Sequence, residues 1–216
     1  TELRRAALVL YLMHELPARY REGAATLHNL VAALDPNSAS RDAAHQALTG
    51  LLEVMEGALL RSAGPRMGGY EAIERGLARL ESLGLRPVQP PQPGVPAQPG
   101  LEELALAQVL SVRAGAHPWR SEQIRRLQES LSIFQAPRHS GDARWLTALA
   151  LLLMGIAQIG DNTGTAETNL RRALSCFEEL RDTWGEAQVR FGLGIVAEEQ
   201  GDLAQAQAHV RDSLQL

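Results

Sequence analysis

The sequence predicts an all-α fold in which about five degenerate helix pairs stack into an α–α superhelix, or solenoid. The 216 residues are rich in Ala, Leu, Arg, Glu and Gln, which favour helices, whereas aromatic residues make up only 4% and runs of β-branched residues are missing. A short phrase, made of an apolar residue, two spacers, a small residue and Leu, also recurs five times. Its closing leucines are separated by 46, 51, 43 and 40 residues, a spacing typical of helical solenoids. The copies are Leu30-Ala33-Leu34, Gly76-Arg79-Leu80, Leu127-Ser130-Leu131, Leu170-Ala173-Leu174 and Val210-Ser213-Leu214.

Ten helices follow from this repeat. Prolines and glycines mark most of their ends, because Pro cannot continue a helix and Gly adopts the conformation that terminates one. The first pair is predicted over residues 2–16 and 19–34, and the third over 101–114 and 121–134. In the second pair the first helix is predicted to end at Gly64, and the second to span residues 70–80.

The fifth pair shows the physical logic of the repeat most clearly. Gly194 and Ala206 are small, so two antiparallel helices can approach closely there. Gly201 is predicted to end the first helix and Asp202 to cap the second. The fourth pair repeats the scheme, with a turn of different length, through Gly155, Gly160-Asp161 and Ala166.

The segment Arg86 to Gly100 interrupts the repeat. It holds six of the eleven prolines and cannot be helical, so we expect a linker or long loop. The predicted organisation is two helix pairs over residues 1–85, the proline-rich segment over 86–100, and three pairs over 101–216. Continuous stacking of all five pairs across a looped-out insertion is equally compatible with the pattern.

From Phe177 onward the sequence carries three dipeptides at fixed spacing, Trp184-Gly185, Leu193-Gly194 and Gly201-Asp202. This run resembles a tetratricopeptide-repeat (TPR) array, of the kind found at the C-terminal end of STAND-class signalling ATPases and of large bacterial transcription regulators. The resemblance is specific over about residues 141–216. Arg190 and Phe191 stand where that family usually has Leu and Asn, so a polar ligand-binding ladder is not carried over.

The resemblance implies a sensor or scaffold arm of a larger cytoplasmic protein, whose ATPase switch lies elsewhere. The chain opens at Thr1 without an initiator Met and stops at Leu216 inside an amphipathic helix, so we expect a piece of that protein. The 21 basic residues are all Arg. Because a Walker A loop requires Lys, this sequence cannot contain one.

Several kinds of chemistry are disfavoured, and we expect neither an enzyme nor a cofactor or metal site. The net charge is −4 without a basic stripe, so we expect no direct nucleic-acid binding. The apolar stretch Trp145 to Ile159 is too short for a membrane span. The single cysteine, Cys176, lies on an apolar helical run, and the six histidines are dispersed.

The expected function is recognition of a protein or peptide in the concave groove of the solenoid, which the first helix of each pair lines. An apolar strip with an acidic edge suits a basic amphipathic helix. The predicted groove residues are Leu152, Ile156, Ile159, Phe191, Ile195, Glu198 and Glu199.

Two alternatives stay open. The arm is also compatible with a sensor that folds over a small metabolite, which would require a closed pocket with convergent polar side chains. The other is self-association, because Leu203, Val210, Leu214 and Leu216 leave an apolar face on the last helix that no further repeat covers.

Overall fold

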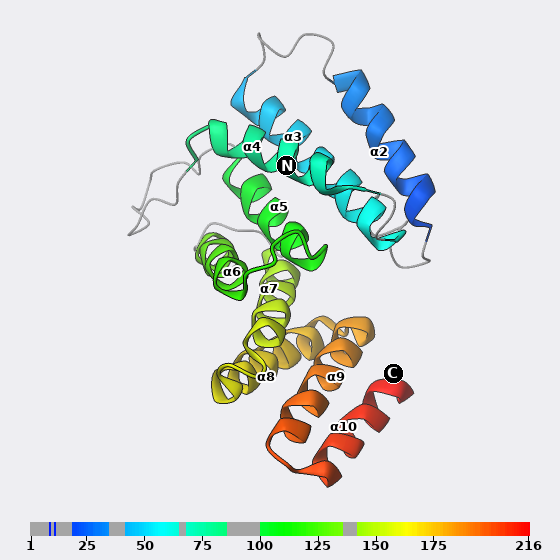
Figure 1. Ribbon diagram of the computed structural model, residues 1–216, viewed down its shortest axis with the longest axis vertical. Coiled ribbons are helices and arrows are strands. Elements are labelled where there is room, and N and C mark those ends of the chain that lie inside the picture. Colours follow the sequence, from blue (N-terminus) through cyan, green and yellow to red (C-terminus); the bar gives the residue numbers. More distant parts are fainter. Residues whose placement is uncertain are drawn as a thin grey trace. The chain divides into compact units, whose positions relative to one another are not determined.

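The structure is a computed structural model that describes residues 9, 11, 19–34, 42–64, 68–85, 100–135 and 142–216. Within these ranges the chain is all-helical, with no strand and with packing between consecutive helices (Figure 1). The helices are α2 (Tyr20–Leu34), α3 (Ala43–Ser62), α4 (Tyr70–Ser82), α5 (Leu101–Arg113), α6 (Arg120–Phe134), α7 (Asp142–Gln158), α8 (Thr163–Leu180), α9 (Thr183–Glu199) and α10 (Leu203–Gln215).

The predicted helix bounds agree closely with the observed ones. The helices expected over 19–34, 101–114 and 121–134 begin and end within one residue of α2, α5 and α6. The helix expected over residues 2–16 lies outside the described residues, apart from Val9 and Tyr11, which are helical.

The chain forms two compact units, residues 1–116 and 117–216. The boundary therefore lies after α5, not at the proline-rich segment, of which residues 86–99 are outside the described part of the chain. The physical reason is the composition of α5, in which every residue from Leu104 to Val112 is buried. This stretch is mostly apolar and needs neighbours on all sides, and α5 packs on α3 and α4 of the first unit. The third predicted pair is thus divided, since α6 belongs to the second unit and packs on α7.

In the first unit α3 is the central helix, with α2, α4 and α5 packed against it. Its residues from Ala47 to Leu59 are all buried. Glycines bring α3 and α4 into backbone contact, because a Cβ added at Gly57 would lie 2.5 Å from the Gly69 carbonyl oxygen and one at Gly76 would lie 2.4 Å from that of Gly50. Any larger residue would force the two helices apart.

In the second unit α7 is central and contacts α6, α8 and α9. The pairs α7–α8 and α9–α10 each pack closely, and α8 also contacts α9. A Cβ at Gly155 would meet Leu170 at 2.7 Å and the Ala166 carbonyl oxygen at 3.1 Å. The prediction that small residues mark the crossing of each pair is confirmed there. It is also confirmed in the last pair, where a Cβ at Gly194 would meet Val210 at 3.1 Å and the Ala206 carbonyl oxygen at 3.4 Å.

The turns within these pairs follow the predicted glycines, with one correction. Gly160 and Gly201 both have positive φ, at 86° and 80°, a conformation that favours glycine. Asp202 caps α10 as expected, accepting a hydrogen bond from the Gln205 amide at 2.9 Å. In the α7–α8 turn Asn162, not Asp161, caps α8, because that turn is one residue longer than the α9–α10 turn.

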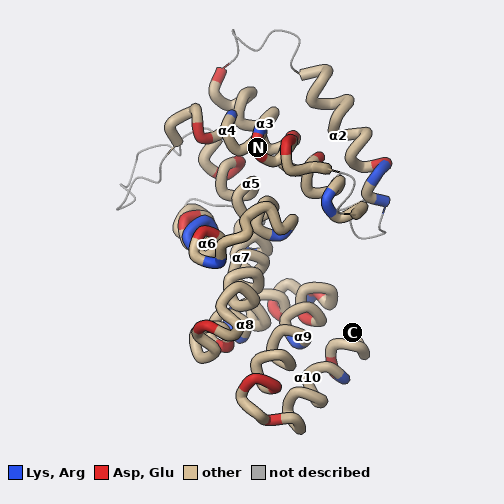
Figure 2. Tube along the Cα trace, viewed as in Figure 1, with Lys and Arg blue, Asp and Glu red and all other residues tan. Residues whose placement is uncertain are grey.

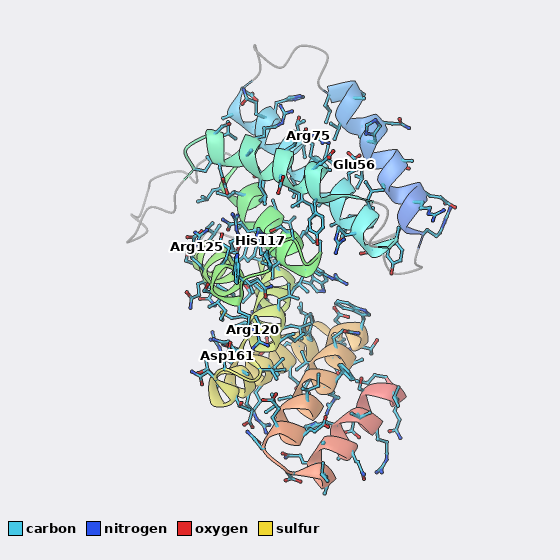
Figure 3. All side chains as sticks on the ribbon, viewed as in Figure 1. Glu56, Arg75, His117, Arg120, Arg125 and Asp161 are labelled. Atoms are coloured by element: carbon cyan, nitrogen blue, oxygen red, sulfur yellow. The ribbon has the colours of Figure 1, made fainter. Side chains whose placement is uncertain are left out.

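Asp161 has a different role in that turn. Its Oδ2 lies 3.1 Å from Nη1 of Arg120, and the same guanidinium nitrogen donates a 2.7 Å hydrogen bond to the Ile159 carbonyl oxygen (Figure 3). The start of α6 is thereby joined to the α7–α8 turn.

Candidate functional site

The exposed face of α9 carries an apolar stripe. Phe191 is 53% exposed and Ile195 is half-buried, and their four-residue spacing places both on one side of the helix. Trp184 and Gln188 extend the same face toward the start of α9, and Glu198 extends it toward the end. We define these five residues as the α9 stripe. Sequence reasoning did not assign Trp184 and Gln188 to the site, although their positions, seven and three residues before Phe191, place them on the same helix face.

On α7 the structure exposes fewer of the predicted groove residues. Ile156 is 44% exposed, as the groove prediction requires. Leu152 on α7 and Ile159, in the turn directly after it, are only 3% and 9% exposed, so their assignment to a binding surface is wrong. Because α7 has α6, α8 and α9 packed around it, most of its apolar side chains are in the core. Leu153, half-buried and three residues before Ile156, lies on the exposed side instead.

An acidic end adjoins the stripe where α9 gives way to α10 (Figure 2). Glu198 and Glu199 are both exposed there. Glu199 accepts a long hydrogen bond of 3.4 Å from Thr163 Oγ1, at the start of α8. Glu167, also on α8, accepts hydrogen bonds from Arg171 and Gln200, which lower the pKa of its carboxyl. The second predicted feature, an acidic edge, is therefore present on the surface.

Asp182 fixes the start of α9. Its Oδ1 accepts a 3.1 Å hydrogen bond from the Gly185 amide and caps the helix. Its Oδ2 accepts a 2.6 Å hydrogen bond from the indole Nε1 of Trp145, on α7. One carboxylate thus joins the first turn of α9 to α7, and the orientation of the α9 stripe depends on it.

Phe177 and Gly185 determine how closely α9 approaches α8. Phe177 is fully buried, and a Cβ on Gly185 would lie 2.2 Å from its ring. Only glycine fits at this position, which explains the Trp184-Gly185 dipeptide in physical terms.

Arg190, directly before Phe191 in the chain, lies about 100° around α9 from that residue and so points away from the stripe. Its Nη2 is 3.5 Å from Glu178 on α8, and its Nη1 is 3.6 Å from Asp212 on α10. Arg190 therefore links α9 to both neighbouring helices. Phe191 adds apolar surface to the stripe.

Among the described residues, no group of three or more His, Cys, Asp or Glu side chains is arranged to hold a metal ion. Burial raises the pKa of the half-buried Cys176 thiol, which keeps it protonated at neutral pH. No helix in the ranges that the structure covers is long and apolar enough to cross a membrane.

Comparisons with known proteins identify no relative of this chain. No protein-family model matches the sequence, and neither the curated proteins nor the solved structures give a significant match.

Proposed function

We propose that this chain is a non-catalytic binding module built from TPR-like helix pairs, and that it recognises an amphipathic helix of a protein partner. The packing of the second unit supports the TPR-like interpretation. Each of α7 and α9 pairs with the following helix through a glycine, α8 packs on α9, and α7 also contacts α9. In such an arrangement the first helices of successive pairs line one face of the array.

The observation that carries the proposal is the exposed apolar surface on those first helices. Ile156 on α7 and Phe191 on α9 are each about half exposed, on helices that contact one another. Large apolar side chains that share an exposed face typically mark an interaction site. An aromatic anchor at the centre of such a face is a common source of binding energy.

The charges around the stripe favour a basic partner. Glu198 and Glu199 are exposed at one end of α9, while Arg190 is engaged with Glu178 and Asp212. A helix with an apolar face and Arg or Lys flanks would complement this surface. The dipeptides Trp184-Gly185, Leu193-Gly194 and Gly201-Asp202 resemble those of TPR arrays. They support the further proposal that the module is the sensor or scaffold arm of a cytoplasmic bacterial signalling ATPase or transcription regulator.

Selection from a displayed peptide library tests the proposal, because the library samples many partner sequences at once. The immobilised 216-residue chain should enrich peptides with apolar residues at positions i, i+3 or i+4, and i+7, flanked by Arg or Lys. Enrichment of acidic peptides, or of none, would contradict the proposed chemistry.

Self-association is a second candidate function, favoured by a separate observation. No residue of α10 is buried, and Leu214 is 83% exposed, with Leu203, Val210 and Leu216 also exposed. Sedimentation velocity over a range of concentrations would detect such an assembly. If α10 mediates it, Leu214→Asp should shift the chain toward monomer, whereas Phe191→Asp should not.

A further inference from the structure

Glu56 on α3 is a buried carboxylate with incomplete hydrogen bonding. Its side chain is 9% exposed, and Oε1 lies 3.1 Å from Nδ1 of His28 on α2. Its other oxygen, Oε2, is buried and has no hydrogen-bond partner. An unsatisfied buried carboxylate oxygen is unfavourable, and native proteins generally provide a donor for each one.

The other buried carboxylate of α3 shows what is missing at Glu56. Glu53, three residues earlier, receives both a guanidinium Nε and an Nη2 hydrogen bond from Arg79 on α4, each at 3.2 Å. That bidentate pairing satisfies both carboxylate oxygens. Glu56 has only the imidazole of His28, whose side chain is 66% exposed and is therefore easily displaced.

Glu56 (labelled in Figure 3) also lines a cleft between α2 and α3, with a volume of about 420 Å³. The walls are largely apolar, from Ala24, Ala25 and Leu60, and the polar residues are Arg21, His28 and Asn29. Such a cleft has room for an aliphatic stem, and Glu56, which lines it, has a carboxylate oxygen that requires a donor.

From this geometry we infer that the α2–α3 cleft binds a guanidinium group carried on an aliphatic stem, with Glu56 as its carboxylate partner. The cation takes the place of the His28 imidazole and donates to both carboxylate oxygens, while the stem lies along Ala24, Ala25 and Leu60. Arg21, which also lines the cleft, is seven residues from His28 on α2, roughly 10 Å along the helix axis. The group can come from a free small molecule or from an Arg side chain of a peptide. This site lies in the first unit, so it is independent of the α9 stripe.

Amide-resolved NMR titration of the full chain tests the inference. The first probe is n-butylguanidinium, with neutral n-butylurea of the same shape as its comparison. The second is acetyl-Gly-Arg-Gly-amide, with the citrulline peptide as its comparison. The guanidinium form of at least one probe should shift amides of α2 and α3 with millimolar affinity, and its neutral form should bind at least about tenfold more weakly. Tighter binding of the peptide would identify an Arg side chain as the source, and binding of butylguanidinium alone would identify a small molecule.

Two variants complete the experiment. Glu56→Gln should weaken binding of the guanidinium probes at least about tenfold. Glu71→Gln, which removes an exposed carboxylate from α4, should leave it unchanged. The inference is overturned if neither cation shifts α2 and α3 at about 10 mM, if the neutral probes bind equally, or if Glu56→Gln binds as well as wild type. Because the comparison of charged with neutral probes uses the wild-type chain, the test holds even if Glu56→Gln fails to fold.

Discussion

Glycine at position 185 shows how a single missing Cβ controls helix packing in the second unit. The Phe177 ring occupies the space where the Cβ would be, and this ring is fully buried. The ring cannot move without disturbing the α8–α9 contact, because protein interiors are close-packed.

Gly185→Ala should therefore lower the free energy of unfolding by about 1 to 3 kcal/mol through overpacking. Gly164→Ala is the matched control, since a Cβ there meets nothing within 4 Å and the residue is exposed. That change should instead raise stability by about 0.5 kcal/mol by restricting the unfolded chain. Urea denaturation of both variants measures the difference, and equal stabilities would show that the α8–α9 packing is different from that described.

The two capping aspartates of the second unit differ in the number of hydrogen bonds that they accept. Asp202 makes one cap hydrogen bond, to the Gln205 amide, whereas Asp182 makes a cap hydrogen bond and also accepts from Trp145. Asp202→Ala should cost about 1 kcal/mol, and Asp182→Ala about 2 kcal/mol, because it also leaves the indole N–H without its acceptor. Equal losses in thermal denaturation would mean that the Trp145 hydrogen bond adds nothing to stability.

At the scale of elements, α10 is the least anchored helix of the second unit. It has no buried residue, and its packing on α9 includes a short approach of Val210 and His209 to Gly194. Burial lowers the pKa of His209, and the neighbouring Arg171 and Arg190 lower it further, against the opposing effect of Asp212 and Glu167.

This shift predicts that the stability of α10 depends on pH. Since the folded state holds the neutral imidazole, the unfolded state binds the proton more readily, and stability decreases as pH falls below the ordinary value of 6.5. The decrease stops once pH falls below the lowered folded-state pKa. Hydrogen exchange of α10 amides should therefore be faster, relative to the intrinsic rate, at about pH 5.5 than at about pH 7.5. In His209→Gln this difference should be smaller; an unchanged difference would assign the pH dependence to another group.

At the scale of the whole molecule, the sequence predicts local structure better than surfaces. Helix bounds and pair crossings were predictable because glycine, proline and small residues act locally, as at Gly155, Gly194 and Gly201. The burial of Leu152 and Ile159 depends on how many helices surround α7, which no local pattern reveals.

The unit boundary and the α2–α3 cleft were missed for the same reason. A proline-rich segment indicates a break in the helices, but it does not show that α5 returns to pack on α3. Glu56 within an apolar helical run is visible in the sequence, yet whether a partner such as Arg79 reaches it depends on helix crossing.

Binding of a peptide by the α9 stripe is the central claim, and the affinity of a library-selected peptide for three forms of the chain tests it most directly. Fluorescence anisotropy would compare wild type, Phe191→Asp and Leu214→Asp, since Phe191 and Leu214 are exposed apolar residues on different helices. Phe191→Asp should weaken binding at least about thirtyfold, as expected for loss of a central aromatic anchor, with helicity unchanged. Ile195→Asp added to it should abolish binding. Leu214→Asp should bind as wild type does. Full affinity of a folded Phe191→Asp variant, or an equal loss in Leu214→Asp, would contradict the proposed site.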